Sequence, residues 1–211
     1  LNSLVNADGT PNLPAKIWFE KLLLRVGLQE KLSESVIDWQ DPDDQTIGGM
    51  GAEANYYQGL SPSYLPSNTQ LHHVEELKLV RGFEGEKYLQ IADYVTTAPN
   101  TDSKLNINTA SAVLLASLDP KLEVNAVQQV IQQRQANLQY FSNVSELWAI
   151  EPFAQVGNEV RTELNDLLGV QSNYFKARIE VILSERKRQF SSDLVRKDKT
   201  VYVAYRSMAP F

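Results

Sequence analysis

The sequence predicts an α+β fold in which a helical block separates an opening helix from a C-terminal antiparallel sheet. Apolar residues follow helical spacing near the start, helical spacing continues with interruptions as far as Leu168, and after Gly169 the apolar period changes to two. With 211 residues, of which 43% are hydrophobic, the chain can bury a core as one domain or as two joined ones.

The first segment of the fold is a helix over residues 14–28. Pro14 suits a first helical turn and Gly27 is a plausible stop. A second, short helix is expected over 29–39, because its apolar residues are spaced for one buried face. A loop rich in Asp and Gly then follows over 40–53.

The middle of the chain predicts a set of short helices. Residues 59–70 contain two Pro and several turn formers, which is typical of a linker or surface loop. From Val74 to Leu168 the apolar residues recur at helical spacing. Asn108 is the expected N-cap of one helix and Gly169 the expected end of the last. No internal repeat is evident.

The C-terminal part predicts three strands. Apolar and polar residues alternate over Tyr174–Glu185, interrupted only by Ile182, and similar strands are expected over Phe190–Val195 and Lys199–Arg206. Short polar connections between them indicate an antiparallel meander.

A three-stranded sheet needs a covering element, and the helix over 14–28 is the obvious one. The predicted organisation is therefore a discontinuous α+β domain of residues 1–58 and 170–211, with residues 59–169 inserted as a helical domain.

Composition excludes several classes of function. The net charge of −6 and the pI of about 5.0 oppose a protein that neutralises phosphates, and the absence of cysteine removes disulfides and thiolate chemistry. No window approaches the roughly 20 apolar residues of a membrane helix. The chain begins at Leu1 instead of Met, so we treat it as a soluble piece whose natural N-terminus lies upstream.

The acidic loop over 38–57 is the first candidate site. Five carboxylates fall within sixteen residues: Asp38, Asp41, Asp43, Asp44 and Glu53. Calcium takes six to eight oxygen ligands from such groups, and without a cation the crowded carboxylates would repel one another. The spacing is not that of an EF-hand. The alternative is a solvated loop whose Asp residues cap turns.

The second candidate is the run over 104–118, followed by a helix over 124–134 and by residues 140–148. It resembles the helix-hairpin-helix segment of small DNA-binding proteins, in which a Gly-rich hairpin approaches a phosphate. Here the link over 118–123 has no glycine and two acids. Nucleic-acid binding is therefore the alternative reading, and a scaffold for protein contacts is preferred.

No enzyme is indicated. His72 and His73 are adjacent, so their side chains would point about 100° apart on a helix and could not share one metal ion. Nucleophile elbows, phosphate loops and dinucleotide fingerprints are absent from the sequence. A metal-dependent hydrolase would also need a general base, and none is apparent.

Three segments, in order, resemble the K-type minor pseudopilins of type II secretion systems, also called general secretion pathway protein K. They are DWQDPDDQ…GAEANYY over 38–57, VEELKLVRGF over 74–83 and KLNINTASAVLLASL over 104–118. The opening LNSLVN over 1–6 is similar to the segment that follows the N-terminal helix of that family.

This resemblance implies a pilin-like fold, a helix on an antiparallel sheet with a large helical insertion. It also implies a structural role as a cap subunit at the tip of the periplasmic pseudopilus. The expected partners are the other minor pseudopilins of the tip complex and secreted substrates, with no nucleic acid. It further implies calcium in the acidic loop and a Gram-negative, periplasmic protein anchored in the inner membrane by an apolar helix upstream of Leu1.

Overall fold

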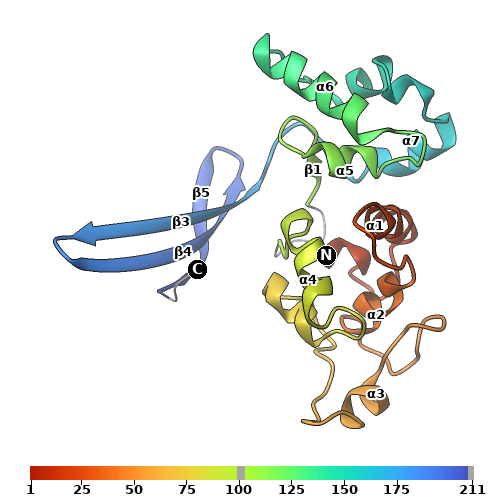
Figure 1. Cartoon of the computed structure of the whole chain (residues 1–211), viewed down its shortest axis with the longest axis vertical. Coiled ribbons are helices and arrows are strands. Elements are labelled where there is room, and N and C mark those ends of the chain that lie inside the picture. The colour runs from red at the N-terminus through yellow and green to blue at the C-terminus, as the bar shows by residue number, and fades with distance from the viewer. Residues whose placement is uncertain (99–102, 209–211) are drawn as a thin grey trace. The chain divides into compact units, whose positions relative to one another are not determined.

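The computed structural model describes residues 1–98 and 103–208. The chain forms two compact units, Leu1–Val170 and Gln171–Phe211, and Figure 1 shows the elements of each. We call the first the helical unit and the second the sheet unit. A mixture of helices with an antiparallel sheet confirms the α+β class.

The helical unit consists of short helices and one pair of very short strands. The α-helices are α1 (Leu13–Arg25), α2 (Leu32–Asp38), α3 (Ala54–Gln58), α4 (Glu86–Ile91), α5 (Ala112–Ala116), α6 (Val124–Ala136) and α7 (Asn158–Asn165). The 3-10 helices are η1 (Asn2–Leu4), η2 (Val74–Leu79), η3 (Ala92–Tyr94), η4 (Val144–Ala149) and η5 (Phe153–Gln155). Strands β1 (Leu105–Asn106) and β2 (Leu168–Gly169) pair in parallel. None of the described helices has the length and hydropathy that crossing a membrane requires.

Two apolar cores divide the helical unit into two lobes. The core of the first lobe, residues 1–98, runs from Leu4 to Ile91 and centres on side chains such as Tyr57 and Phe83. The core of the second lobe, residues 103–170, runs from Ile107 to Leu168. The expected boundary at residues 58 and 59 therefore falls inside the first core and does not separate two domains.

Helix α1 packs differently from the prediction. Its apolar face, formed by Ala15, Phe19, Leu22 and Leu23, is buried in the core of the first lobe. The expectation that this helix covers the C-terminal sheet was wrong for its apolar face, because residues of the first lobe already pack against that face.

In each lobe one asparagine, the buried Asn2 and the half-buried Asn108, joins the two ends of the lobe through hydrogen bonds. In the first lobe, the Asn2 Nδ2 donates to the carbonyls of Leu71 and Ala98, each at 3.0 Å, while its Oδ1 accepts from the Leu71 N–H at 3.0 Å. In the second lobe, Asn108 makes the same three bonds: Nδ2 donates to the carbonyls of Phe141 (3.0 Å) and Val170 (3.2 Å), and Oδ1 accepts from the Phe141 N–H at 2.7 Å. The predicted role of Asn108 as an N-cap was wrong, because Ser111 caps α5.

The lobes share a plan beyond these asparagines. A Glu in the first turn of η2 and of η4, Glu76 and Glu146, accepts N–H bonds from the residues just before its helix. A buried Leu follows each Glu, and a buried Phe lies six residues further along, at Phe83 and Phe153. The lobes are thus two versions of one unit, although the sequence showed no repeat.

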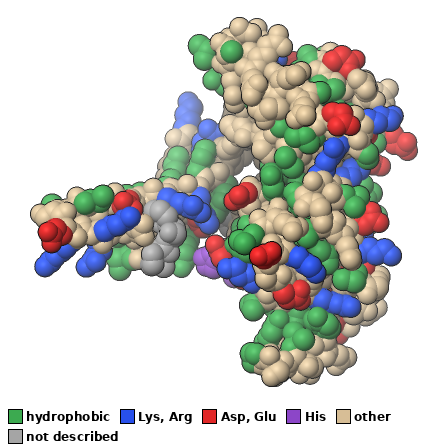
Figure 2. Space-filling view, in the orientation of Figure 1, with side chains coloured by type: hydrophobic (Ala, Val, Ile, Leu, Met, Phe, Trp, Pro, Cys, Tyr) green, Lys and Arg blue, Asp and Glu red, His purple; other side chains and the backbone are tan. Residues whose placement is uncertain are grey.

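The sheet unit contains β3 (Tyr174–Leu183), β4 (Arg186–Lys197) and β5 (Thr200–Ser207) in antiparallel order β3-β4-β5. The predicted meander is confirmed, and β4 is longer than expected because the basic residues after Glu185 pair with the end of β3. Leu194 lies opposite both Phe175 and Val203, which are 40% and 51% exposed, so one sheet face is apolar and open to solvent in this unit. Figure 2 shows hydrophobic and basic side chains together on the sheet unit.

Candidate metal centre

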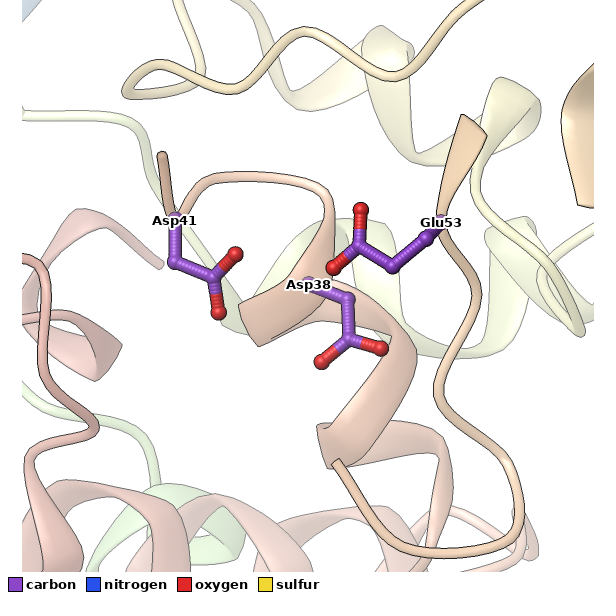
Figure 3. Close-up of side chains that lie close together, drawn as sticks. All are labelled: Asp38, Asp41 and Glu53. Atoms are coloured by element: carbon purple, nitrogen blue, oxygen red, sulfur yellow. The ribbon is translucent and has the colours of Figure 1, made fainter. Parts of the chain in front are cut away.

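Helix α2 and the loop that follows it bring three carboxylates together. Asp38 is the last residue of α2, and the Asp41 N–H donates to the Ile37 carbonyl at 2.9 Å, which turns the chain back at the helix end. Glu53 arrives from the other end of the loop, directly before α3, and its carbonyl accepts the Tyr56 N–H at 2.9 Å. Figure 3 shows the three side chains.

The loop is held against α2 by two carboxylates one helical turn apart. The Glu34 Oε2 accepts the Met50 N–H at 2.8 Å, and the two Asp38 oxygens accept the Ile47 N–H at 3.1 and 3.2 Å. A Cβ atom at Gly51 would lie 2.3 Å from Asp38 Oδ2, so only glycine lets the loop approach this closely. Glu34 was missed by the sequence analysis. Its position four residues before Asp38, on the same helix face, was the available signal.

The three carboxylates of Asp38, Asp41 and Glu53 form a buried cluster. One oxygen of each lies within 4.8 Å of the others, and the side chains are only 0%, 3% and 4% exposed. Asp41 Oδ1 and both oxygens of Glu53 lack a hydrogen-bond partner, and the ion pairs of the described residues do not involve these three groups. Buried carboxylate oxygens in this state are costly unless a cation or a proton compensates them.

Burial and mutual repulsion raise all three pKa values. Burial, then the charges of Asp38 and Asp41, raises the pKa of Glu53 to about 8. Burial, then the charges of Asp38 and Asp43, raises the pKa of Asp41 to about 7. Burial raises the pKa of Asp38 to about 6, against the N–H donors of Ile47 and Ala52, which favour its ionised form. The cluster therefore attracts protons when no other cation is present.

Two of the five predicted ligands lie outside the cluster. Asp43 and Asp44 are exposed, and the Asp43 Oδ1 accepts the Gln45 N–H at 2.7 Å, as in an ordinary Asx turn. Their charges still help to raise the pKa of Glu53. The structure thus brings together Asp38, Asp41 and Glu53, with the loop residues between them as the natural source of further oxygen ligands.

The donor set is made of oxygen alone and suits a hard cation better than zinc or copper. His73 caps η2, and both His72 and His73 are exposed. The arrangement can hold a cation and lock a loop onto a helix, which is a structural role.

Comparisons with known proteins bear on both lobes. A family model described as "Type II secretion system (T2SS), protein K" matches residues 1–100, and a second model with the same description matches residues 105–171.

Three curated relatives illustrate the similarity. Type II secretion system protein K of Klebsiella pneumoniae is 30% identical over 92% of this chain, that of Pseudomonas aeruginosa 29% over 90%, and that of Aeromonas hydrophila 28% over 84%. The chain spans 60%, 56% and 55% of the length of these relatives, respectively.

A solved structure has the same fold. It is the crystal structure of the GspK-GspI-GspJ complex from the type 2 secretion system of enterotoxigenic Escherichia coli, with a TM-score of 0.85 and 24% identity. The similarity covers 100% of this chain and 75% of that chain.

Proposed function

This chain belongs to the protein K family of type II secretion systems, and on that premise we propose that it is a minor pseudopilin that caps the tip of the secretion pseudopilus. The observation that carries the proposal is that the family match extends over both lobes of the helical unit. In this role the chain acts by binding other proteins, which fits a family of secretion-system components and a buried carboxylate cluster suited to a cation.

The cap position follows from size. The helical unit takes up residues 1–170, whereas the sheet unit has only residues 171–211. Subunits of a helical filament pack closely and repeat one heterologous contact. A subunit that carries so large a helical unit in addition to its sheet would obstruct the next subunit, so it can end a fibre and cannot extend it.

The proposed partners are the other minor pseudopilins, and secreted proteins are further candidates. The support is that the relative of known structure is GspK in a complex with GspI and GspJ. The test is size-exclusion chromatography of this protein with the I- and J-type pseudopilins of its own system. We expect one ternary peak, and separate elution of all three at micromolar concentration would contradict the proposal.

We further propose a pilin-like arrangement in which a helix covers the apolar face of the sheet. Phe175, Ile179 and Val203 are each 40% exposed or more, and an open apolar face of this size requires a covering element. Since α1 buries its main face elsewhere, we assign the cover to a helix upstream of Leu1, which would also supply the inner-membrane anchor of a periplasmic protein. Its test is whether a longer chain protects the β3 amides from hydrogen exchange.

We propose calcium as the cation of the cluster. Three carboxylates supply up to six oxygens, of which three are buried without a partner, and flexible oxygen-only sites favour calcium over magnesium. Calcium binding would replace the protons that the raised pKa values attract and fix the loop over 40–53. Titration calorimetry with calcium, and with magnesium as the control, tests this assignment.

Nucleic-acid binding is the weaker alternative. The link between α5 and α6, where the hairpin of a DNA-binding module would lie, carries Asp119 and Glu123. The second lobe as a whole has seven acidic residues against four basic ones over 103–170. Its field therefore repels phosphates, and a gel shift at low salt with duplex DNA should show no retardation.

A further inference from the structure

The common plan of the two lobes identifies a counterpart of the carboxylate cluster in the second lobe. Helix α2 ends at Asp38 and is followed by Asp41-Pro42, while α5 ends at Ala116 and is followed by Asp119-Pro120. Glu53 directly precedes α3, and Glu123 directly precedes α6. The three carboxylate positions thus correspond to Ala116, Asp119 and Glu123.

A cation from the first lobe lies at this counterpart. The Arg25 Nη2 donates to the carbonyl oxygens of Ala116, Asp119 and Pro120, each at 3.2 Å, and of Leu122 at 2.5 Å. All four carbonyls belong to the end of α5 and the link to α6. Arg25 itself is the last residue of α1.

The rest of the same face of α1 supports this contact. One and two turns before Arg25, the Lys21 Nζ donates to the Leu118 carbonyl at 3.0 Å, and the Trp18 Nε1 donates to the Ser117 Oγ at 2.8 Å. Trp18 also packs on the second core, whereas Phe19 and Leu22 pack on the first. Helix α1 therefore belongs to both lobes.

The number of oxygens around Arg25 is the informative feature. One Nη atom carries two hydrogens, yet four carbonyl oxygens lie within 3.2 Å of it. Ordinary hydrogen bonding would use two of them. Converging carbonyl dipoles at the C-terminal end of a helix create a negative site that solvates a positive charge, as carbonyl oxygens do around metal ions.

We propose that the carbonyls of Ala116, Asp119, Pro120 and Leu122 form a cation site in the second lobe, and that the guanidinium of Arg25 is its resident cation. The first lobe thereby supplies the ion that completes the second, and this contact joins the lobes. The proposal does not depend on calcium in the first lobe. It predicts that the empty site accepts a small external cation of similar shape.

Two variants of equal chain length test the role of charge. Arg25→Lys keeps a cation on the site, whereas Arg25→Met keeps the apolar stem alone. We expect thermal unfolding of the full chain to begin with loss of the second lobe and the melting temperature to fall by about 5 °C in Arg25→Met, with less than half that loss in Arg25→Lys. Equal losses in both variants would overturn the proposal, because packing and not charge would then explain the contact.

Chemical rescue of Arg25→Ala tests the site itself. We expect 20 mM guanidinium chloride to raise its melting temperature by about 1–2 °C above the value in 20 mM added NaCl, while the wild type shows no rise. Lys16→Ala is the matched control, since Lys16 lies on α1 but pairs with Glu20 of the same helix. If guanidinium affects Arg25→Ala, Lys16→Ala and the wild type alike, the carbonyls do not form a cation site. Should Arg25→Ala fail to fold, the same measurement of melting temperature with guanidinium chloride is made on Arg25→Met, and a rise there supports the cation site.

Discussion

The carboxylate cluster makes a sharp prediction about the metal-free protein, in which Glu53→Gln should be stabilising. Between pH 4.5 and 8 the folded protein holds a proton on Glu53 that the unfolded chain has released, because burial raises the pKa from 4.5 to about 8. More protons are bound by the folded state in this window, so the stability of the metal-free protein falls as the pH rises. Glutamine carries no charge and removes this dependence.

The magnitude follows from the raised pKa. Within this window the free energy of unfolding falls by about 1.4 kcal/mol for each pH unit. At pH 7 the raised pKa of Glu53 therefore lowers the stability of the metal-free protein by up to about 3 kcal/mol. In a chain of this length that corresponds to a melting temperature roughly 6–12 °C higher for Glu53→Gln. At pH 5 the two proteins should differ by less than about 1 kcal/mol.

The assay is thermal unfolding in EDTA and in calcium, at pH 5 and at pH 8. In EDTA at pH 8, Glu53→Gln should melt above the wild type. In calcium the order should reverse, because the wild type gains a ligand that the variant has weakened. Asp44→Asn is the matched control: it removes the same charge from the same loop but from an exposed position, and it should follow the wild type in calcium.

One result would refute the reasoning. If Glu53→Gln destabilised the metal-free protein by the same amount at pH 5 and at pH 8, the Glu53 carboxylate would be satisfied by contacts within the protein. Repulsion in the cluster would then be absent, and so would the argument for a cation.

Three further predictions follow from the same structure. Calcium should raise the melting temperature more at pH 8 than at pH 6, because protons compete for the carboxylates with pKa values of about 6, 7 and 8; an equal shift at both pH values would contradict this. Gly51→Ala should lower the unfolding free energy in urea by about 2 kcal/mol, since its Cβ would meet Asp38 Oδ2 at 2.3 Å, whereas Gly49→Ala, with no atom within 4 Å, should change it by less than about 0.5 kcal/mol. Asn108→Ala should lower the unfolding free energy by about 3 kcal/mol because three partly buried backbone groups lose their hydrogen-bond partner, and Asn137→Ala at an exposed position, measured alongside, should change it little.

The local patterns of the sequence predicted the elements better than their packing. The alternation after Gly169 predicted β3 and β5, and the clustered acids predicted the three residues that meet in the buried carboxylate cluster. Exposure could not be read from composition, so Asp43 and Asp44 were included with the buried acids. Helix α1 had the expected residues, but the partner of its apolar face depends on side chains that are distant in the sequence.

The repeat of the two lobes was hidden by unequal spacing. In the first lobe α1 is inserted between Asn2 and α2, while Asn108 stands four residues before α5. The loop from Asp41 to Glu53 is also longer than the link from Asp119 to Glu123. The correspondence becomes clear from the equivalent hydrogen bonds of the two asparagines, together with the matching Glu, Leu and Phe positions.

The asparagine closures have a consequence for how such a protein can arise. Asn2 bonds to Ala98 and Asn108 bonds to Val170, so the two ends of each lobe are tied together by one amide side chain. A module whose ends meet can be copied in tandem, or lengthened between its elements, without disturbing the neighbouring copy. Tandem duplication followed by independent divergence would account for the difference between the copies: the first lobe has a cluster of acidic side chains, and the second lobe binds Arg25 of the first at the equivalent place.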